Sequence, residues 1–173
     1  GLCLVGSEMC IRDRQLVGDV CHLSLVERHR GTGAVVNGFV SGFGYTGSMA
    51  IASSVAHDSH HMIVAGTNQE MMASAANRLG EVGGGVSLWK DGAEVALIEL
   101  PIAGLMSDSK ASEVAVKAQA IVSAMIDCGC TLNNAYMQHT LLALVVIPEL
   151  RISDLGLVDV NRFELTEIFE PNS

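Results

Sequence analysis

Basic residues are scarce in this sequence, and they do not cluster. Ten Lys and Arg stand against 19 Asp and Glu, which gives a formal net charge of −9 and a pI of about 5.0. An acidic surface repels phosphate backbones, and a chain without a run of Lys or Arg offers no stripe on which a nucleic acid could bind. We therefore expect no nucleic-acid partner.

Long apolar runs and paired cysteines are also missing. The longest strongly apolar run, residues 141–147, is far shorter than the roughly 20 residues that cross a bilayer, so we expect no membrane association. The five cysteines are odd in number and include no Cys-x-x-Cys pair, which favours reduced thiols and a cytoplasmic location. Cys128 and Cys130 are one residue apart, a spacing that strains a disulfide, and we interpret them as part of a helix end.

Apolar residues, in contrast, are abundant. They make up 49% of the 173 residues, while charged residues make up only 17%, a balance typical of a folded domain with its own core. The pattern of apolar residues predicts strands within 15–29, 34–40, 49–55 and 62–65. A further hairpin, residues 86–100, is predicted to turn at Asp91-Gly92.

The first predicted helix follows these strands. Thr67 and Glu70 have the spacing of a capping box, in which each side chain binds the other residue's backbone N–H. Apolar residues then recur at helical spacing as far as Leu79, and we expect Gly80 and the glycine run 83–85 to stop the helix. The glycine run 83–85 follows a helix rather than preceding one, so we interpret it as a helix stop and a site of close backbone packing and not as a phosphate cradle.

The second predicted helix begins near residues 107–109 and ends at Gly129. Residues 135–144 fit either a short helix or a buried strand, and Pro148 limits any helix there. The order of strands, helix, hairpin and helix predicts an α+β fold with a mixed or antiparallel sheet and two to three packed helices.

Residues 53–61 form the densest polar segment, between two predicted strands. The members that could carry chemistry are His57, Asp58, Ser59, His60 and His61. Imidazoles and carboxylates bind divalent transition metals. On a strand His57, Ser59 and His61 would share a face; on a helical turn His57, His60 and His61 would. The alternative is a polar loop with local hydrogen bonds, since a short His/Asp run is a weak motif.

A second polar segment, residues 27–33, ends a predicted strand. Glu27 and His29 are its candidate site residues, weaker than His57, Asp58 and His60. The segment could act as a substrate or phosphate loop, but it lacks the Gly-x-x-x-x-Gly-Lys-Ser/Thr pattern of a nucleotide P-loop. We favour a hairpin that carries a surface salt bridge.

Several blocks of the sequence are similar to one family. The blocks are residues 38–44, 50–60, 63–68, 83–85, 100–107, 146–150 and 156–160. Together they resemble the C-terminal domain of adenine deaminases, in the amidohydrolase superfamily, from about residue 19 to residue 169. Separate blocks in one order are more specific than a single motif. We therefore predict that residues 15–173 form this domain and that residues 1–14 are a leader outside the family, with an artefactual origin as a hypothesis.

The resemblance implies hydrolytic deamination of adenine to hypoxanthine and ammonia, in purine salvage. In that family a metal pair, typically manganese or iron, lies in an N-terminal (β/α) barrel and activates the attacking water. The barrel's His-x-His is absent from this chain, and 173 residues are too few for a barrel of about 250 residues beside this domain. We therefore expect one domain of a longer, homo-oligomeric enzyme, inactive without its barrel.

The resemblance also implies where the candidate residues lie. His57, Asp58 and His60 are expected near the substrate mouth or a metal, whereas Ser59 and His61 are weaker candidates, and His61 stands where the family usually has Asn. A purely structural role, in which the domain packs on the barrel and builds the oligomer, is the alternative. An autonomous metal hydrolase is disfavoured, because neither a general base nor a complete ligand set can be named.

Overall fold

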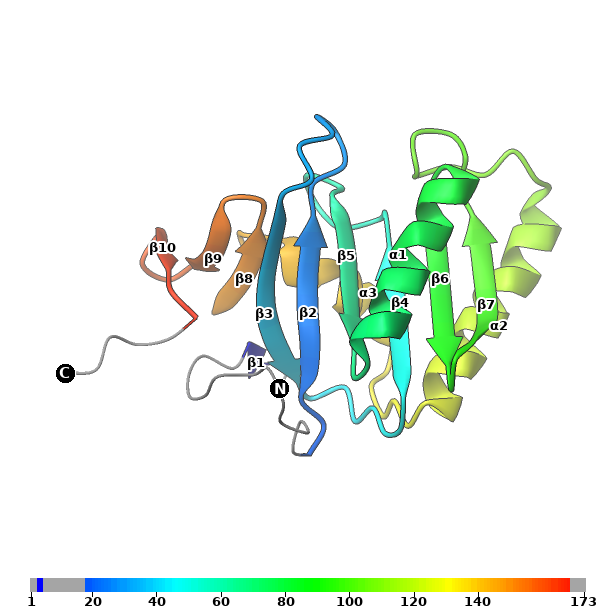
Figure 1. Cartoon of the computed structure of the whole chain (residues 1–173), viewed down its shortest axis with the longest axis horizontal. Helices are drawn as coiled ribbons and strands as arrows, with labels where there is room; N and C mark the ends of the chain where they lie inside the picture. The colour runs from blue at the N-terminus through cyan, green and yellow to red at the C-terminus, as the bar shows by residue number, and fades with distance from the viewer. Residues whose placement is uncertain (1–2, 5–17, 169–173) are drawn as a thin grey trace.

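An antiparallel sheet forms the centre of the structure, a computed structural model that describes residues 3–4 and 18–168. Its strands run in the order β1-β3-β2-β5-β4-β6-β7, and every neighbouring pair is antiparallel. Three hairpins, β2–β3, β4–β5 and β6–β7, therefore lie side by side (Figure 1). The strands are β1 (Cys3–Leu4), β2 (Cys21–Val26), β3 (Val35–Ser41), β4 (Met49–Ser53), β5 (Met62–Gly66), β6 (Gly85–Lys90) and β7 (Ala93–Glu99).

Helices cover both faces of this sheet. Figure 1 shows α1 (Gln69–Val82) in front of β4, β5 and β6, and α2 (Ala111–Asp127) and α3 (Ala135–Thr140) on the opposite side. Strand alternation explains the division, because successive side chains point to opposite faces. On β4, Ala50 and Ala52 pack with α1, whereas Met49 and Ile51 belong to the larger core that includes Ile121 and Met125 of α2.

A small second sheet completes the fold beside β3. Its strands, in the order β10-β9-β8, are β8 (Leu150–Ser153), β9 (Gly156–Asp159) and β10 (Glu164–Thr166). A 3-10 turn (Leu141–Ala143) connects α3 to this region and buries Leu142 in the main core. The α+β fold predicted from the sequence is confirmed, with both sheets antiparallel and three α-helices among the described residues. None of the helices in the described ranges is long and apolar enough to span a membrane.

The cap of α1 differs from the predicted one. Asn68 is the N-cap, and its Oδ1 accepts a hydrogen bond from Met71 N at 3.0 Å. The Thr67 hydroxyl instead donates to Gly47 O at 2.7 Å and accepts from Met49 N at 3.0 Å. The predicted capping box is therefore wrong, because Thr67 is used to anchor the helix start to the sheet.

This assignment predicts the effect of changing the cap. We expect Asn68→Ala to lower the free energy of unfolding by about 1 kcal/mol, because Met71 N–H loses its partner. Asn68→Ser should retain most of the stability, since Ser is an equally good N-cap. Urea unfolding followed by circular dichroism measures both variants, and equal stability of the two would contradict the assignment.

The end of α1 is set by the glycine run and not by Gly80. Gly80 lies inside the helix, so the predicted stop there is wrong, and the helix ends at Gly83 with φ +83°. A Cβ on Gly84 would lie 2.4 Å from Gly104 Cα, and a Cβ on Gly85 would lie 1.8 Å from Ile98 O. The interpretation of this run as a helix stop and a site of close backbone packing is confirmed.

The second helix also begins later than predicted, at Ala111 rather than near residues 107–109. Its end agrees with the prediction. Cys128 is the C-cap residue, and Cys128 and Cys130 are buried free thiols. Residues 135–144, left open between helix and strand, form α3 and the 3-10 turn.

Candidate functional site

The polar segments singled out in the sequence lie together at one end of the sheet. Val26, the last residue of β2, pairs with Met62, the first residue of β5, so loops 27–34 and 54–61 are neighbours. The loop of residues 100–110, which follows β7, lies at the same end (Figure 1). We call these three loops the loop end. Antiparallel order brings them together, because adjacent strands start and stop at the same edge.

Glu27 organises the first of these loops. Its carboxylate accepts hydrogen bonds from the backbone N–H groups of His29 at 2.6 Å, Arg30 at 2.7 Å and Thr32 at 3.1 Å. The Thr32 hydroxyl donates a further one at 2.9 Å. These bonds, led by those from the Thr32 and Arg30 backbone, lower the pKa of Glu27 to about 2. Glu27 is therefore an ionised, loop-forming carboxylate at neutral pH, poorly suited to proton transfer.

The hairpin predicted for residues 27–33 is confirmed, since they connect β2 to β3. The predicted surface salt bridge joins this loop to another element, because Arg30 Nη2 lies 3.4 Å from Asp154 Oδ2 in the β8–β9 turn. Asp154 thereby adds the small second sheet to the surroundings of the loop end.

The histidines of residues 53–61 divide into two groups. The rings of His57 and His60 are 5.2 Å apart, and His60 Nδ1 accepts a hydrogen bond from Ala56 N at 3.3 Å. His61 points elsewhere: its buried ring is 4.6 Å from the ring of His29. Residues 57–59 form a turn and His60 has φ +53°, so neither a strand nor a helical turn aligns the histidines. Neither shared face considered from the sequence is present.

The loop end does not provide a metal centre by itself. Among residues 3–4 and 18–168, no group of three or more His, Cys, Asp or Glu side chains is arranged to hold a metal ion. His29 Nε2 is 2.6 Å from Ser59 O, and His61 Nδ1 accepts a hydrogen bond from Arg28 N at 3.4 Å. These local bonds match the polar-loop interpretation, and the described side chains do not fit a metal.

Two of these imidazoles are held neutral. Burial, followed by the proximity of His57, lowers the pKa of His60. Burial also lowers the pKa of His61, although Asp154, whose Oδ2 is 3.6 Å from His61 Nε2, opposes the shift. Neutral imidazoles offer one donor and one acceptor each, and Asp58 is exposed next to them. Because His60 Nδ1 already accepts from Ala56 N, the His60 Nε2–H and the Asp58 carboxylate are the donor and acceptor that the loop end can offer to a polar ring.

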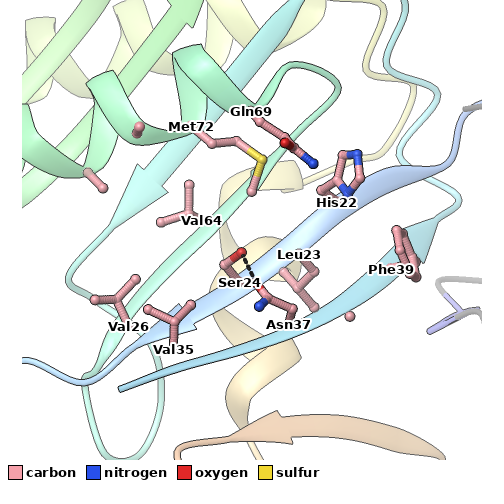
Figure 2. A pocket seen from close by; sticks show the side chains of 13 residues that line it. His22, Leu23, Ser24, Val26, Val35, Asn37, Phe39, Val64, Gln69 and Met72 are labelled. Carbon is pink, nitrogen blue, oxygen red and sulfur yellow. Dashed lines mark hydrogen bonds between the residues drawn. The ribbon is translucent and has the colours of Figure 1, made fainter. Parts of the chain in front are cut away.

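A groove elsewhere on the molecule was not predicted from the sequence. It has a volume of about 460 Å³ and lies between α1 and strands β2 and β3 (Figure 2). Its lining includes His22, Phe39, Gln69 and Met72. These positions resemble the ordinary solvent face of a strand or helix, so the sequence carries no signal for them. His22 is the one residue with an ionisable side chain among the described residues that line the groove, and burial lowers its pKa, so the groove has no acid–base pair.

A protein-family model matches most of the chain. Residues 6–164 match the adenine deaminase C-terminal domain, a range that contains the whole loop end. The match begins within residues 1–14, the predicted leader. Most of residues 1–14 lie outside the described residues, and the boundary at residue 14 stays a prediction.

Curated relatives agree with the family match. The chain is 74% identical over 153 residues to the adenine deaminase of Ruegeria pomeroyi and 73% identical over 151 residues to that of Paracoccus denitrificans. It is 45% identical over 150 residues to the adenine deaminase of Moorella thermoacetica. The alignments cover 88%, 87% and 87% of this chain but 25% of each relative. The chain thus spans about a quarter of the length of the relatives it matches.

Proposed function

This chain belongs to the adenine deaminase C-terminal domain family, and from that premise we propose that it serves an enzyme that hydrolyses adenine to hypoxanthine and ammonia. The family match over residues 6–164 is the observation that carries the proposal. The enzyme is proposed to act in purine salvage in the cytoplasm, as a homo-oligomer.

The proposed enzyme takes its metal, manganese or iron, from a barrel outside this chain. The described side chains do not fit a metal centre, so the water-activating step is assigned to that barrel. Activity is accordingly expected only when the two parts are joined.

The loop end is proposed to contribute to the substrate mouth, through His57, Asp58 and His60. Support comes from the chemistry of these side chains. The exposed Asp58 carboxylate can accept a hydrogen bond from the amino group of a purine, and an imidazole N–H can donate one to a ring nitrogen. Their position on loops at one end of a rigid sheet is also typical of binding residues.

A second role, in packing and oligomer formation, is supported by the outer surface of α2. Val116, Val122 and Ile126 are 71%, 43% and 60% exposed there. Neighbouring exposed apolar side chains on one helix are typical of a surface that another protein element covers. This role is compatible with a loop end at the substrate mouth.

A chimera tests the proposed function. This chain would replace the matching quarter of the Ruegeria pomeroyi adenine deaminase. The two are 74% identical over the 153 aligned residues. We expect adenine turnover from the chimera and none from the chain alone. Turnover by the isolated chain would contradict the assignment of the chemistry to the barrel.

Two variants of the chimera test the loop end. His57→Ala and His60→Ala are each expected to lower kcat/KM by about ten-fold or more, since a misplaced or missing polar contact at a reacting ligand costs at least that much. His22→Ala, in the groove beside α1, is the matched control and should leave kcat/KM unchanged. Unchanged kinetics and metal content in both loop variants would favour the purely structural role.

A further inference from the structure

We propose that Arg28 is a positioning residue that fixes the loop carrying His57 and His60, an inference that rests on the proposed function of the loop end. Arg28 was not among the candidate site residues predicted from the sequence. It acts on backbone carbonyl groups of two other loops.

The Arg28 side chain connects all three loops of the loop end. From the β2–β3 loop, its Nε donates a hydrogen bond to His60 O at 2.6 Å. Its Nη2 donates to Ala103 O at 2.9 Å, in the loop that follows β7. The planar guanidinium presents donors in a fixed fork, so one side chain can set the distance between two carbonyl groups. A Lys ammonium lacks that fork and cannot hold both carbonyls in the same geometry.

The receiving loop is shaped to fit the guanidinium. Gly104 has φ +73°, and a Cβ there would lie 3.0 Å from Arg28 Nη1 and 3.1 Å from Arg28 Cζ. On its other side, Gly104 O accepts a hydrogen bond from Ser54 Oγ at 2.6 Å, and Ser54 Oγ accepts one from Gly85 N at 2.7 Å. The Ala103–Gly104 turn is therefore anchored to the sheet, and Arg28 extends that anchor to His60.

The backbone of the His57 loop contributes to the same arrangement. His60 N donates to Ala56 O at 2.7 Å, and Ala56 N donates to His60 Nδ1 at 3.3 Å, which closes a short turn around His57. His60 O faces out of this turn and is held by Arg28. Without the Arg28 side chain, the turn would keep its internal bonds and the contact between His29 Nε2 and Ser59 O at 2.6 Å. It would lose the hydrogen bond at His60 O, and with it the connection to Ala103 in the loop that follows β7.

The adenine deaminase chimera provides the test, with Arg28→Gln and Arg28→Lys as variants. Hydrogen–deuterium exchange measures the mobility of peptides that cover residues 54–61 and 101–106, since exchange reports local opening. Steady-state kinetics measures kcat and KM for adenine. Arg78→Gln is the matched control, because Arg78 forms ion pairs with Glu81 at 3.0 Å and Glu94 at 3.0 Å, on α1 and β7.

We expect Arg28→Gln to raise deuterium uptake in both peptides together and to lower kcat/KM by about ten-fold or more. Arg28→Lys should reach neither the deuterium uptake nor the kcat/KM of the unchanged chimera. Arg78→Gln should leave both quantities unchanged. Gly104→Ala reaches the same contact from the other side, by crowding the guanidinium, and should raise uptake in residues 54–61. It keeps the inference testable if Arg28→Gln fails to fold.

Unchanged uptake in residues 54–61 for both Arg28→Gln and Gly104→Ala would overturn the inference, whatever the His57 and His60 variants show about the proposed function. Raised uptake with unchanged kcat/KM would overturn the role of Arg28 in the reaction. Loss of kcat/KM in His57→Ala and His60→Ala with no effect in Arg28→Gln would leave the proposed function standing and reject only Arg28.

Discussion

Gly85→Ala is expected to lower the free energy of unfolding by more than about 4 kcal/mol, which is a large fraction of the stability of a typical domain. A Cβ at this position would lie 1.8 Å from Ile98 O and 3.0 Å from Ile98 C. Both are backbone atoms of the neighbouring strand β7, so neither can move aside without breaking the β6–β7 ladder. The φ of +143° adds strain for any L side chain.

Gly80→Ala is the matched control for this prediction. Gly80 is exposed within α1, and a Cβ there would meet no atom within 4 Å. The same substitution should therefore stabilise the protein by about 0.5–1 kcal/mol, because Ala restricts the unfolded chain and favours the helix. Urea unfolding of both variants gives the comparison. Equal effects at the two positions would contradict the close approach of β6 and β7.

Stability should fall as pH decreases from about 6.5 to about 4, chiefly because of His139. The ring is fully buried, and neither ring nitrogen has a hydrogen-bond partner among the described residues. Burial lowers the pKa of His139 to about 4. In the unfolded chain the pKa is about 6.5, so between these values the unfolded state binds a proton that the folded state excludes. His139 therefore contributes about 3 kcal/mol to the free energy of unfolding above pH 6.5, and this contribution is lost by about pH 4.

His139→Leu isolates this contribution. The variant removes the titrating group and the two unpaired nitrogens, so its stability should depend much less on pH between 4 and 6.5. Burial lowers the pKa of His22, His60 and His61 as well, so a smaller decline should remain. Urea midpoints measured at intervals from pH 4 to pH 8 give both curves. Parallel curves for the wild-type chain and His139→Leu would rule out His139 as the main cause.

The sequence was sufficient to predict the strands and two of the three hairpins, β2–β3 and β6–β7, but not the β4–β5 pairing or the order in which the hairpins join. Strand runs and the Asp91-Gly92 turn are local signals, and they predicted β2 to β7 with shifts of a few residues at the ends. The pairing of β2 with β5 and of β4 with β6 depends on contacts between distant residues. The small second sheet was missed because its strands of three to four residues are too short for a periodic pattern.

Tertiary contacts also decided the features that the sequence predicted wrongly. Thr67 and Asn68 are both good N-cap residues, and the hydrogen bonds of the Thr67 hydroxyl with Gly47 O and Met49 N leave Asn68 as the cap. At the loop end, the polar segments were identifiable from their composition. Their connection through Arg28 was not, because the acceptors are backbone carbonyls and every residue has one.

The side-by-side hairpins also have a consequence for the order of folding. Each of β2–β3, β4–β5 and β6–β7 closes over a short stretch of chain, and hairpins of this kind form within microseconds. Pairing β4 with β6 brings Ser53 opposite Val86 and closes a longer stretch of chain, which contains β5 and α1. The entropy lost on closing it is therefore larger than for a single hairpin. We therefore expect the joining of the hairpins to be the slow step, with the three loops of the loop end meeting only after β2 has paired with β5 and β4 with β6.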